Sequence, residues 1–175
     1  MKKISRFFIP GLIAICFSLG VNAQSSQQNL NQVELMKQFI GTWKTETGVD
    51  SIALWEVIPS DKGYLTNIYW QSKGVTYSTT KGIIGFTWKN NLPDQIVNLV
   101  VLWSGGGISY DMGRFDSDKK ISFERFNAVH SHILAQWEMN FQTKDKITEI
   151  YKYRGYKDTW DNAKVTEYTF TRVKK

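Results

Sequence analysis

The stretch Phe39-Ile40-Gly41-Thr42-Trp43 marks the point where the sequence changes from a helical to an extended pattern. Before it, apolar residues recur at nearly helical spacing, at Leu30, Val33, Met36 and Phe39. This spacing predicts one short helix over residues 30–40, which Asn29 or Asn31 caps at its start and Gly41 ends. After Gly41 the period falls from about 3.6 residues to about two, which is the period of a β-strand.

The rest of the chain consists of short stretches rich in β-branched and aromatic residues, each bounded by turn residues such as Gly, Asn, Asp and Pro. The connections between these stretches are too short for crossover helices, so neighbouring strands should be antiparallel. The pattern predicts about ten strands, at residues 42–47, 51–58, 64–71, 75–88, 95–103, 108–115, 120–126, 131–141, 146–154 and 164–173.

An antiparallel sheet with this many strands has to close into a barrel or divide into a sandwich, because open edges promote pairing between molecules. A Greek-key sandwich needs at least one long return connection, and the connections here are short except for residues 155–162. Gly82 and Gly85 suit the sharp bends of barrel strands. We therefore predict an all-β fold, an antiparallel up-and-down closed barrel of about 8–10 strands preceded by one short N-terminal helix.

Residues 1–23 have the pattern of a cleaved export signal. Lys2, Lys3 and Arg6 precede an apolar run over residues 7–20, and Val21-Asn22-Ala23 places small residues where signal peptidase reads them. The run is shorter than the ~20 apolar residues that a membrane-spanning helix needs. We expect a signal peptide at 1–23 and export to the periplasm or the cell exterior, with no integral membrane segment after cleavage. Residues 24–175 should form one domain, in which 24–40 are a tail and the short helix.

Cysteine usage and charge exclude several functions. Cys16 is the only cysteine and lies inside the predicted signal, so the exported part should have no disulfide, thiol nucleophile or cysteine metal site. Three of the 22 basic residues lie in the same segment, which leaves 19 basic against 16 acidic residues. These basic residues are scattered, whereas a nucleic-acid binder gathers them on one face. We therefore expect no nucleic-acid partner.

The Gly41-x-Trp43 motif after a short helix, followed by a series of short antiparallel strands, resembles the lipocalin/calycin superfamily. Small exported bacterial lipocalin-like proteins look most similar. The resemblance implies that Trp43 packs across the closed end of the barrel and that an arginine of the last strand covers it. Arg172 occupies that position here, so the resemblance assigns structural roles to Gly41, Trp43 and Arg172.

Two charged residues fall on otherwise apolar faces of predicted strands. Strand alternation places Arg125 on the same face as Phe123, and Glu149 on the same face as Tyr151. A charge that points into a core is unfavourable unless it is paired, so a direct Arg125–Glu149 ion pair is one possibility. They could instead line a partly hydrated cavity and orient a polar ligand group. Each could also lie near a strand end and reach water.

The leading hypothesis is that the barrel binds a small, partly apolar molecule in its interior, without catalysis and without a cofactor. The predicted ligand-binding residues are Trp70, Arg125, Trp137, Glu149 and Tyr151. One alternative is an enzyme of the cyclase, isomerase or hydrolase type, with an interior carboxylate such as Glu149 or Glu138 as its acid–base group. A second alternative is a barrel that is filled by its own aromatic residues and serves as a structural or interaction module.

The two histidines, His130 and His132, are weak metal candidates. Their spacing by two would point both to one side of a strand, where Glu138 could add a carboxylate. Two imidazole nitrogens do not complete a tetrahedral site, however, and residues 127–131 have the composition of a loop. Either histidine could in principle bind haem, but a haem pocket needs an apolar wall around its axial ligand. We therefore expect two solvated histidines and no metal.

Overall fold

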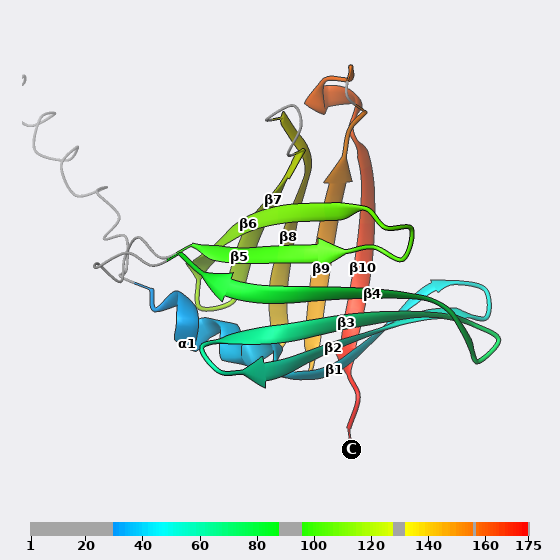
Figure 1. Cartoon of the computed structure of the whole chain (residues 1–175), viewed down its shortest axis with the longest axis horizontal. Coiled ribbons are helices and arrows are strands. Elements are labelled where there is room, and N and C mark those ends of the chain that lie inside the picture. Colours follow the sequence, from blue (N-terminus) through cyan, green and yellow to red (C-terminus); the bar gives the residue numbers. More distant parts are fainter. Residues whose placement is uncertain (1–29, 88–95, 128–131, 156, 175) are drawn as a thin grey trace, which may run out of the picture.

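The computed structural model describes residues 30–87, 96–127, 132–155 and 157–174. Within them, the antiparallel strands form a closed barrel in which each strand neighbours the next along the chain and the last meets the first (Figure 1). The predicted up-and-down barrel is therefore confirmed, and the sandwich alternative is wrong. The strands are β1 (Gly41–Gly48), β2 (Ser51–Ser60), β3 (Gly63–Ser72), β4 (Val75–Phe86), β5 (Val97–Leu102), β6 (Ile108–Ser117), β7 (Lys120–Asn127), β8 (His132–Thr143), β9 (Lys146–Tyr153) and β10 (Lys164–Arg172).

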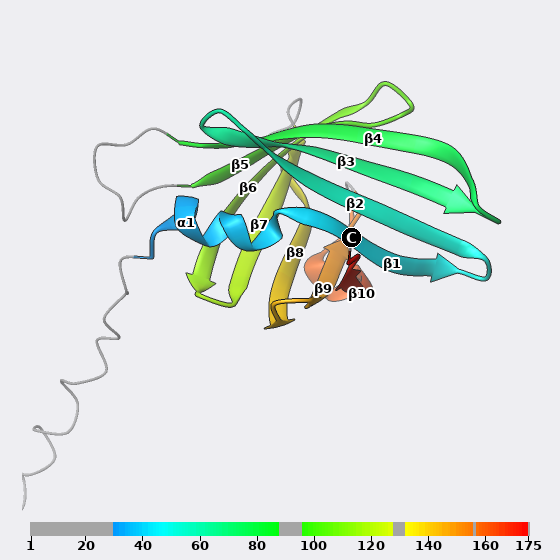
Figure 2. The same cartoon turned by 90° about the horizontal axis from the view of Figure 1, so that it is seen from below.

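The predicted N-terminal helix is also present, as α1 (Gln32–Met36) followed by the 3-10 turn η1 (Lys37–Phe39), and it lies across one end of the barrel (Figure 2). Asn31 caps α1, because its Oδ1 accepts a hydrogen bond from the backbone N–H of Glu34 at 3.1 Å. Gln32 is fully buried, and its Oε1 accepts a hydrogen bond from the backbone N–H of Phe115. This contact ties the helix to β6. No helix in the described ranges is long and apolar enough to cross a membrane.

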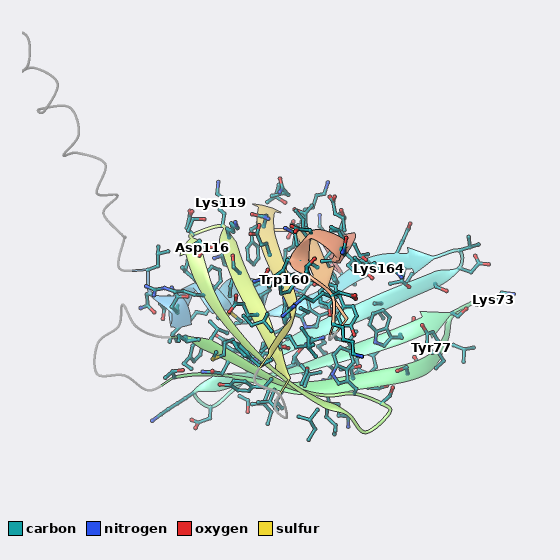
Figure 3. All side chains as sticks on the ribbon, turned by 90° about the horizontal axis from the view of Figure 1, so that it is seen from above. Lys73, Tyr77, Asp116, Lys119, Trp160 and Lys164 are labelled. Carbon is teal, nitrogen blue, oxygen red and sulfur yellow. The ribbon has the colours of Figure 1, made fainter. Side chains whose placement is uncertain are left out.

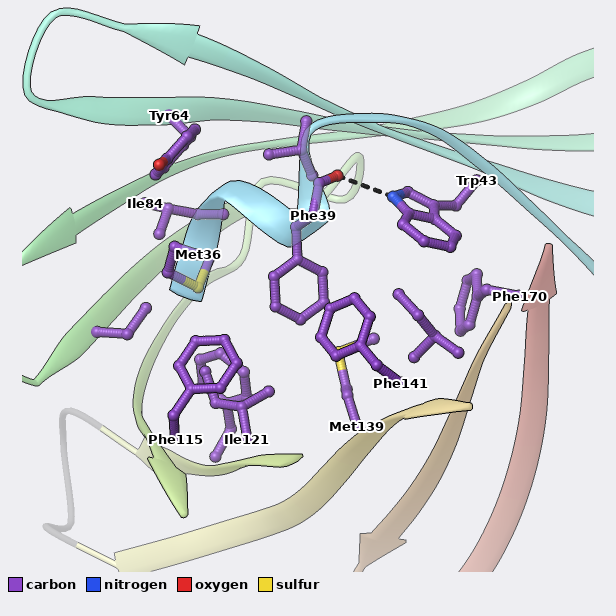
Figure 4. Close-up of a cluster of buried hydrophobic side chains, with 14 of the residues drawn as sticks. Met36, Phe39, Trp43, Tyr64, Ile84, Phe115, Ile121, Met139, Phe141 and Phe170 are labelled. Atoms are coloured by element: carbon purple, nitrogen blue, oxygen red, sulfur yellow. Dashed lines mark hydrogen bonds between the residues drawn. The ribbon is translucent and has the colours of Figure 1, made fainter. Parts of the chain in front are cut away.

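Aromatic side chains fill the end of the barrel beneath the helix (Figure 4). The ring of Phe39 lies 4.7 Å from that of Phe141 and 5.3 Å from that of Trp55, between centroids. Trp43 has no exposed surface, and its indole N–H donates to the carbonyl of Phe39 at 2.8 Å. Because offset aromatic pairs add to the energy of apolar burial, this cluster anchors the helix to the barrel.

Arg172 in the last strand contacts the residues just before the first strand, which begins at Gly41. The guanidinium of Arg172 lies 4.1 Å above the ring of Trp43 and donates hydrogen bonds to the carbonyls of Ile40 and Gln38. It therefore satisfies carbonyl groups at the end of the helical segment, which lack partners there. Gly41 has a φ of +124°, and a Cβ at this position would lie 2.8 Å from Nη1 of Arg172. Glycine is required here for both reasons.

The barrel closes only partly along the seam between β1 and β10. These strands pair at Trp43–Arg172 and Lys44–Thr171, and no further residue pairs follow in the described part of either strand. Beyond them, β1 continues beside β2 and β10 continues beside β9, and the two strands diverge (Figures 1 and 2). Beyond these two residue pairs, the facing edges of β1 and β10 have no neighbouring strand among the described residues.

Candidate functional site

A cavity of about 330 Å³ occupies the part of the barrel that the aromatic cluster does not fill. Met36 and Phe39 form its floor. Its wall is mostly aromatic and aliphatic and carries a few polar groups, as in typical small-molecule sites. Thr45 of β1 and Tyr168 of β10 are both in this wall, so the cavity extends to the seam. The interior of the barrel is thus filled at one end only.

All five residues predicted to bind a ligand lie in the wall of this cavity, from strands β3, β7, β8 and β9: Trp70, Arg125, Trp137, Glu149 and Tyr151. Strand alternation explains the position of Arg125, Trp137 and Glu149, because each lies on the same face as a buried apolar residue two positions away in its strand. Their position is a structural finding, whereas their role in binding stays a prediction.

Arg125 forms its ion pair with Asp111 of β6, so the direct Arg125–Glu149 pair considered from the sequence is wrong. Nε of Arg125 lies 2.8 Å from Oδ1 of Asp111, and Nη2 lies 3.1 Å from Oδ2. The two residues face each other in the register of β6 and β7. Asp111 has no exposed surface. This two-point geometry is the strongest arrangement for an arginine and a carboxylate.

Aromatic rings enclose the guanidinium of Arg125. Its Cζ lies 5.0 Å from the ring centroid of Trp103 and 5.1 Å from that of Trp137, and Nη1 donates to the hydroxyl of Tyr151 at 3.2 Å. Burial lowers the pKa of Arg125, but the hydrogen bond and charge of Asp111 outweigh this and raise the pKa above its ordinary value. Arg125 therefore stays charged, and most of its hydrogen-bonding capacity is already used.

Glu149 is the carboxylate of the cavity that lacks a hydrogen-bond partner among the described residues. It lies beside Met139 of β8 and Tyr168 of β10 in the sheet register. Burial raises its pKa to about 7, and the positive charge of Arg125 opposes this only in part. Glu149 therefore changes its protonation state near neutral pH, unlike an exposed glutamate.

Two residues of this site, Asp111 and Trp103, were not predicted from the sequence. A signal for Asp111 was present, because alternation puts it on the same face as Phe115, in the same way as Arg125 shares a face with Phe123. Trp103 follows the last residue of β5 and lies next to a glycine turn. Outside a strand, alternation no longer predicts which way a side chain points. Its indole N–H donates to Ser109 at 3.2 Å, which turns its ring toward Arg125.

The other acid–base and metal candidates lie elsewhere. Glu138 is on the outer face of β8, where it forms an ion pair with Lys120 at 3.0 Å, so its role as an interior carboxylate is wrong. His130 lies outside the described residues, and His132 is described only as the first residue of β8. Within the parts of the chain that are described, no three His, Cys, Asp or Glu side chains form a group that could hold a metal ion.

The loop between β9 and β10 carries an anchored tryptophan. Trp160, labelled in Figure 3, begins the short turn η3 (Trp160–Asn162). The guanidinium of Arg154 lies 4.8 Å from its ring centroid. Arg154 also donates to the carbonyl of Ile133 at 3.1 Å and to that of Asp158 at 2.8 Å. The loop is therefore fastened to the ends of β8 and β9.

No protein-family model matches the chain, and no curated protein matches it in sequence. The barrel and its cavity are therefore the basis for assigning a function.

Proposed function

We propose that this protein is an exported, lipocalin-like barrel that binds a small, partly apolar molecule in its interior. The cavity of about 330 Å³ carries this proposal, because its size and its mostly apolar wall with a few polar groups suit such a ligand. A barrel that serves only as a structural module would have no need of an unfilled interior.

The lipocalin-like assignment is supported by the closed end of the barrel. The contacts among Gly41, Trp43 and Arg172 match the arrangement that the resemblance implies. Export is supported by the pattern of residues 1–23 alone.

A neutral apolar fluorophore, N-phenyl-1-naphthylamine, tests interior binding. Val101 lines the cavity and is 5 % exposed, whereas its neighbour Val100 faces outward on the same strand. We expect saturable binding to the unmodified protein, loss of binding in Val101→Trp, and retention in Val100→Trp. Circular dichroism of both variants checks that the barrel is intact. Equal behaviour of the two variants would show that the probe binds outside the cavity.

The natural ligand can be sought by native mass spectrometry of protein purified from its own cell envelope. We expect a bound mass that is present in the unmodified protein and absent from Val101→Trp. Protein without any bound small molecule, combined with no binding of the fluorophore, would contradict the proposed function.

One observation favours the second candidate function, an enzyme that uses an interior carboxylate. The pKa of Glu149, raised to about 7 by burial, suits a general acid or base at neutral pH. If Glu149 is catalytic, Glu149→Gln should trap unreacted substrate in the cavity, and the unmodified protein should release a product of different mass or structure. Identical small molecules from both proteins would exclude catalysis by this residue.

A further inference from the structure

The polar groups of the cavity limit the kind of ligand that it accepts. Arg125 is a cation of the cavity wall, but Asp111 neutralises it in a two-point ion pair, and Tyr151 accepts a third hydrogen bond. Trp103 and Trp137 cover the guanidinium on its faces. A ligand carboxylate would have to compete with Asp111 for Arg125, and Asp111 cannot move to water because it is fully buried.

Glu149 differs from Arg125 in that its hydrogen-bonding capacity is unused by the described residues. Its carboxylate lines the cavity and accepts no hydrogen bond from the described residues. Since the Arg125–Asp111 pair is neutral as a unit, an ionised Glu149 gives the interior a net negative charge. Other groups in the wall do not cancel it, because Tyr151, Tyr168 and Thr45 are neutral, and Lys81 is an exposed residue at the margin.

Glu149 is half-buried and faces the cavity. A carboxylate that is partly withdrawn from bulk water without a hydrogen-bond donor is unfavourable, and a bound donor removes that penalty. We propose, resting on the interior binding proposed above, that Glu149 receives the polar head of the ligand and that this head is a hydrogen-bond donor, preferably a protonated amine. The apolar part of the ligand then contacts the aromatic and aliphatic wall.

The position of Glu149 also fixes where the head group lies. Glu149 is paired with Tyr168 of β10, and β10 borders the seam. The amine should therefore bind on the seam side of the cavity, between β9 and β10, rather than at the Arg125–Asp111 pair.

Three probes with one apolar tail test this proposal: phenylbutylamine, phenylbutanol and phenylbutanoate, each competing against N-phenyl-1-naphthylamine. At about pH 8.5 the amine is protonated and Glu149 is ionised. We expect the amine to bind at least about tenfold more tightly than the alcohol, and the carboxylate at least about tenfold more weakly, as expected for a charge pair in a partly desolvated site.

Glu149→Gln removes the charge and keeps the shape of the side chain. In this variant the amine should lose its advantage, so that amine and alcohol bind within about threefold of each other, while the affinity of the alcohol stays nearly unchanged. Glu138→Gln on the outer face of β8 is the matched control and should behave as the unmodified protein. At about pH 5.5, protonation of Glu149 should reduce the amine preference of the unmodified protein.

The outcomes separate this proposal from the proposed function. If the fluorophore binds but the carboxylate competes as well as the amine, or Glu149→Gln keeps the amine preference, the head-group proposal is wrong and interior binding stands. Failure of all three probes to compete with a bound fluorophore also overturns the head-group proposal. If the fluorophore itself does not bind, the proposed function is wrong and the head-group proposal falls with it.

Discussion

The carboxylate of Asp111 and the guanidinium of Arg125 form a two-point ion pair inside the barrel, with Nε–Oδ1 and Nη2–Oδ2 distances of 2.8 and 3.1 Å. The pair joins neighbouring strands and is almost fully withdrawn from water, with side-chain exposures of 0 % for Asp111 and 17 % for Arg125. Its geometry makes Arg125 a structural partner as well as part of the cavity wall.

This pair should make the effects of single and double substitution strongly non-additive. Asp111→Ala or Arg125→Ala leaves one buried charge without its partner, so each should lower the free energy of unfolding by about 3–5 kcal/mol. The double variant should lose much less than the sum of the two. Urea unfolding followed by tryptophan fluorescence measures this. Additive losses would mean that the two side chains are not coupled in solution.

Gly41 should be intolerant of a side chain. Gly41→Ala combines a left-handed backbone conformation, at φ +124°, with a contact of 2.8 Å to Nη1 of Arg172. We expect a loss of about 1–3 kcal/mol in the free energy of unfolding. Gly85→Ala is the control, since a Cβ there meets nothing within 4 Å. Equal stabilities of the two variants in urea would contradict the role given to Gly41.

Glu149 should make the stability of the protein depend on pH. Its pKa is raised from 4.5 to about 7 in the folded state, so the folded protein holds this proton more tightly than the unfolded chain does. The associated stability is present at low pH and is lost as the pH rises through the pKa of the folded state. Between about pH 5 and 8 the unmodified protein should lose roughly 2–3 kcal/mol relative to Glu149→Gln. A constant difference between the two proteins across this range would show that the pKa of Glu149 is not raised.

Gly113 should be needed for the position of Phe123. A Cβ on Gly113 would overlap the ring of Phe123, which stacks on Trp137 at 5.0 Å. Gly113→Ala should therefore lower the free energy of unfolding by about 1–3 kcal/mol through overpacking. Shortening the obstructing ring, in Gly113→Ala with Phe123→Leu, should recover part of this loss relative to Phe123→Leu alone. If the free energy of unfolding is not recovered, the loss in Gly113→Ala does not come from contact with the ring of Phe123.

Hydrogen exchange should reveal the seam between β1 and β10. Amides of residues 165–169 that point away from β9 have no strand partner, whereas Lys44 and Thr171 face each other in the paired part. We expect the former to exchange much faster, because exchange of paired amides requires local opening. Uniform protection along β10 would show that the seam is closed in solution.

The strand order and the inward direction of several cavity residues were predictable from the sequence because they follow from short turns and alternation. Arg125 shares a strand face with the buried Phe123, and Glu149 shares one with the buried Ile147. Alternation therefore predicted that both face inward, but it left open whether they pair, line a cavity or reach water at a strand end. The partner of Arg125 was not predictable in this way. Asp111 lies directly opposite Arg125 in the register of β6 and β7, and this register follows from the closed barrel and not from the pattern of either strand.

Alternation also cannot show which side chains point inward where both faces of a strand are apolar. Ile83 and Val100 are neighbours across β4 and β5 and face outward, with exposures of 61 % and 42 %. Hydrophobicity alone would have placed them in the core. Their direction depends on which face of the sheet curves around the cavity, which is a property of the closed barrel and not of either strand.

The short pairing between β1 and β10 bears on the size of molecule that the proposed interior site would accept. Every other neighbouring pair of strands shares six or more residue pairs in the described residues, whereas this one shares two. The circumference of the barrel can therefore lengthen at the seam without breaking a long ladder of hydrogen bonds. If the interior binds a ligand as proposed, its capacity is set by the distance between these two strand edges, and we expect molecules larger than the present cavity to bind as well.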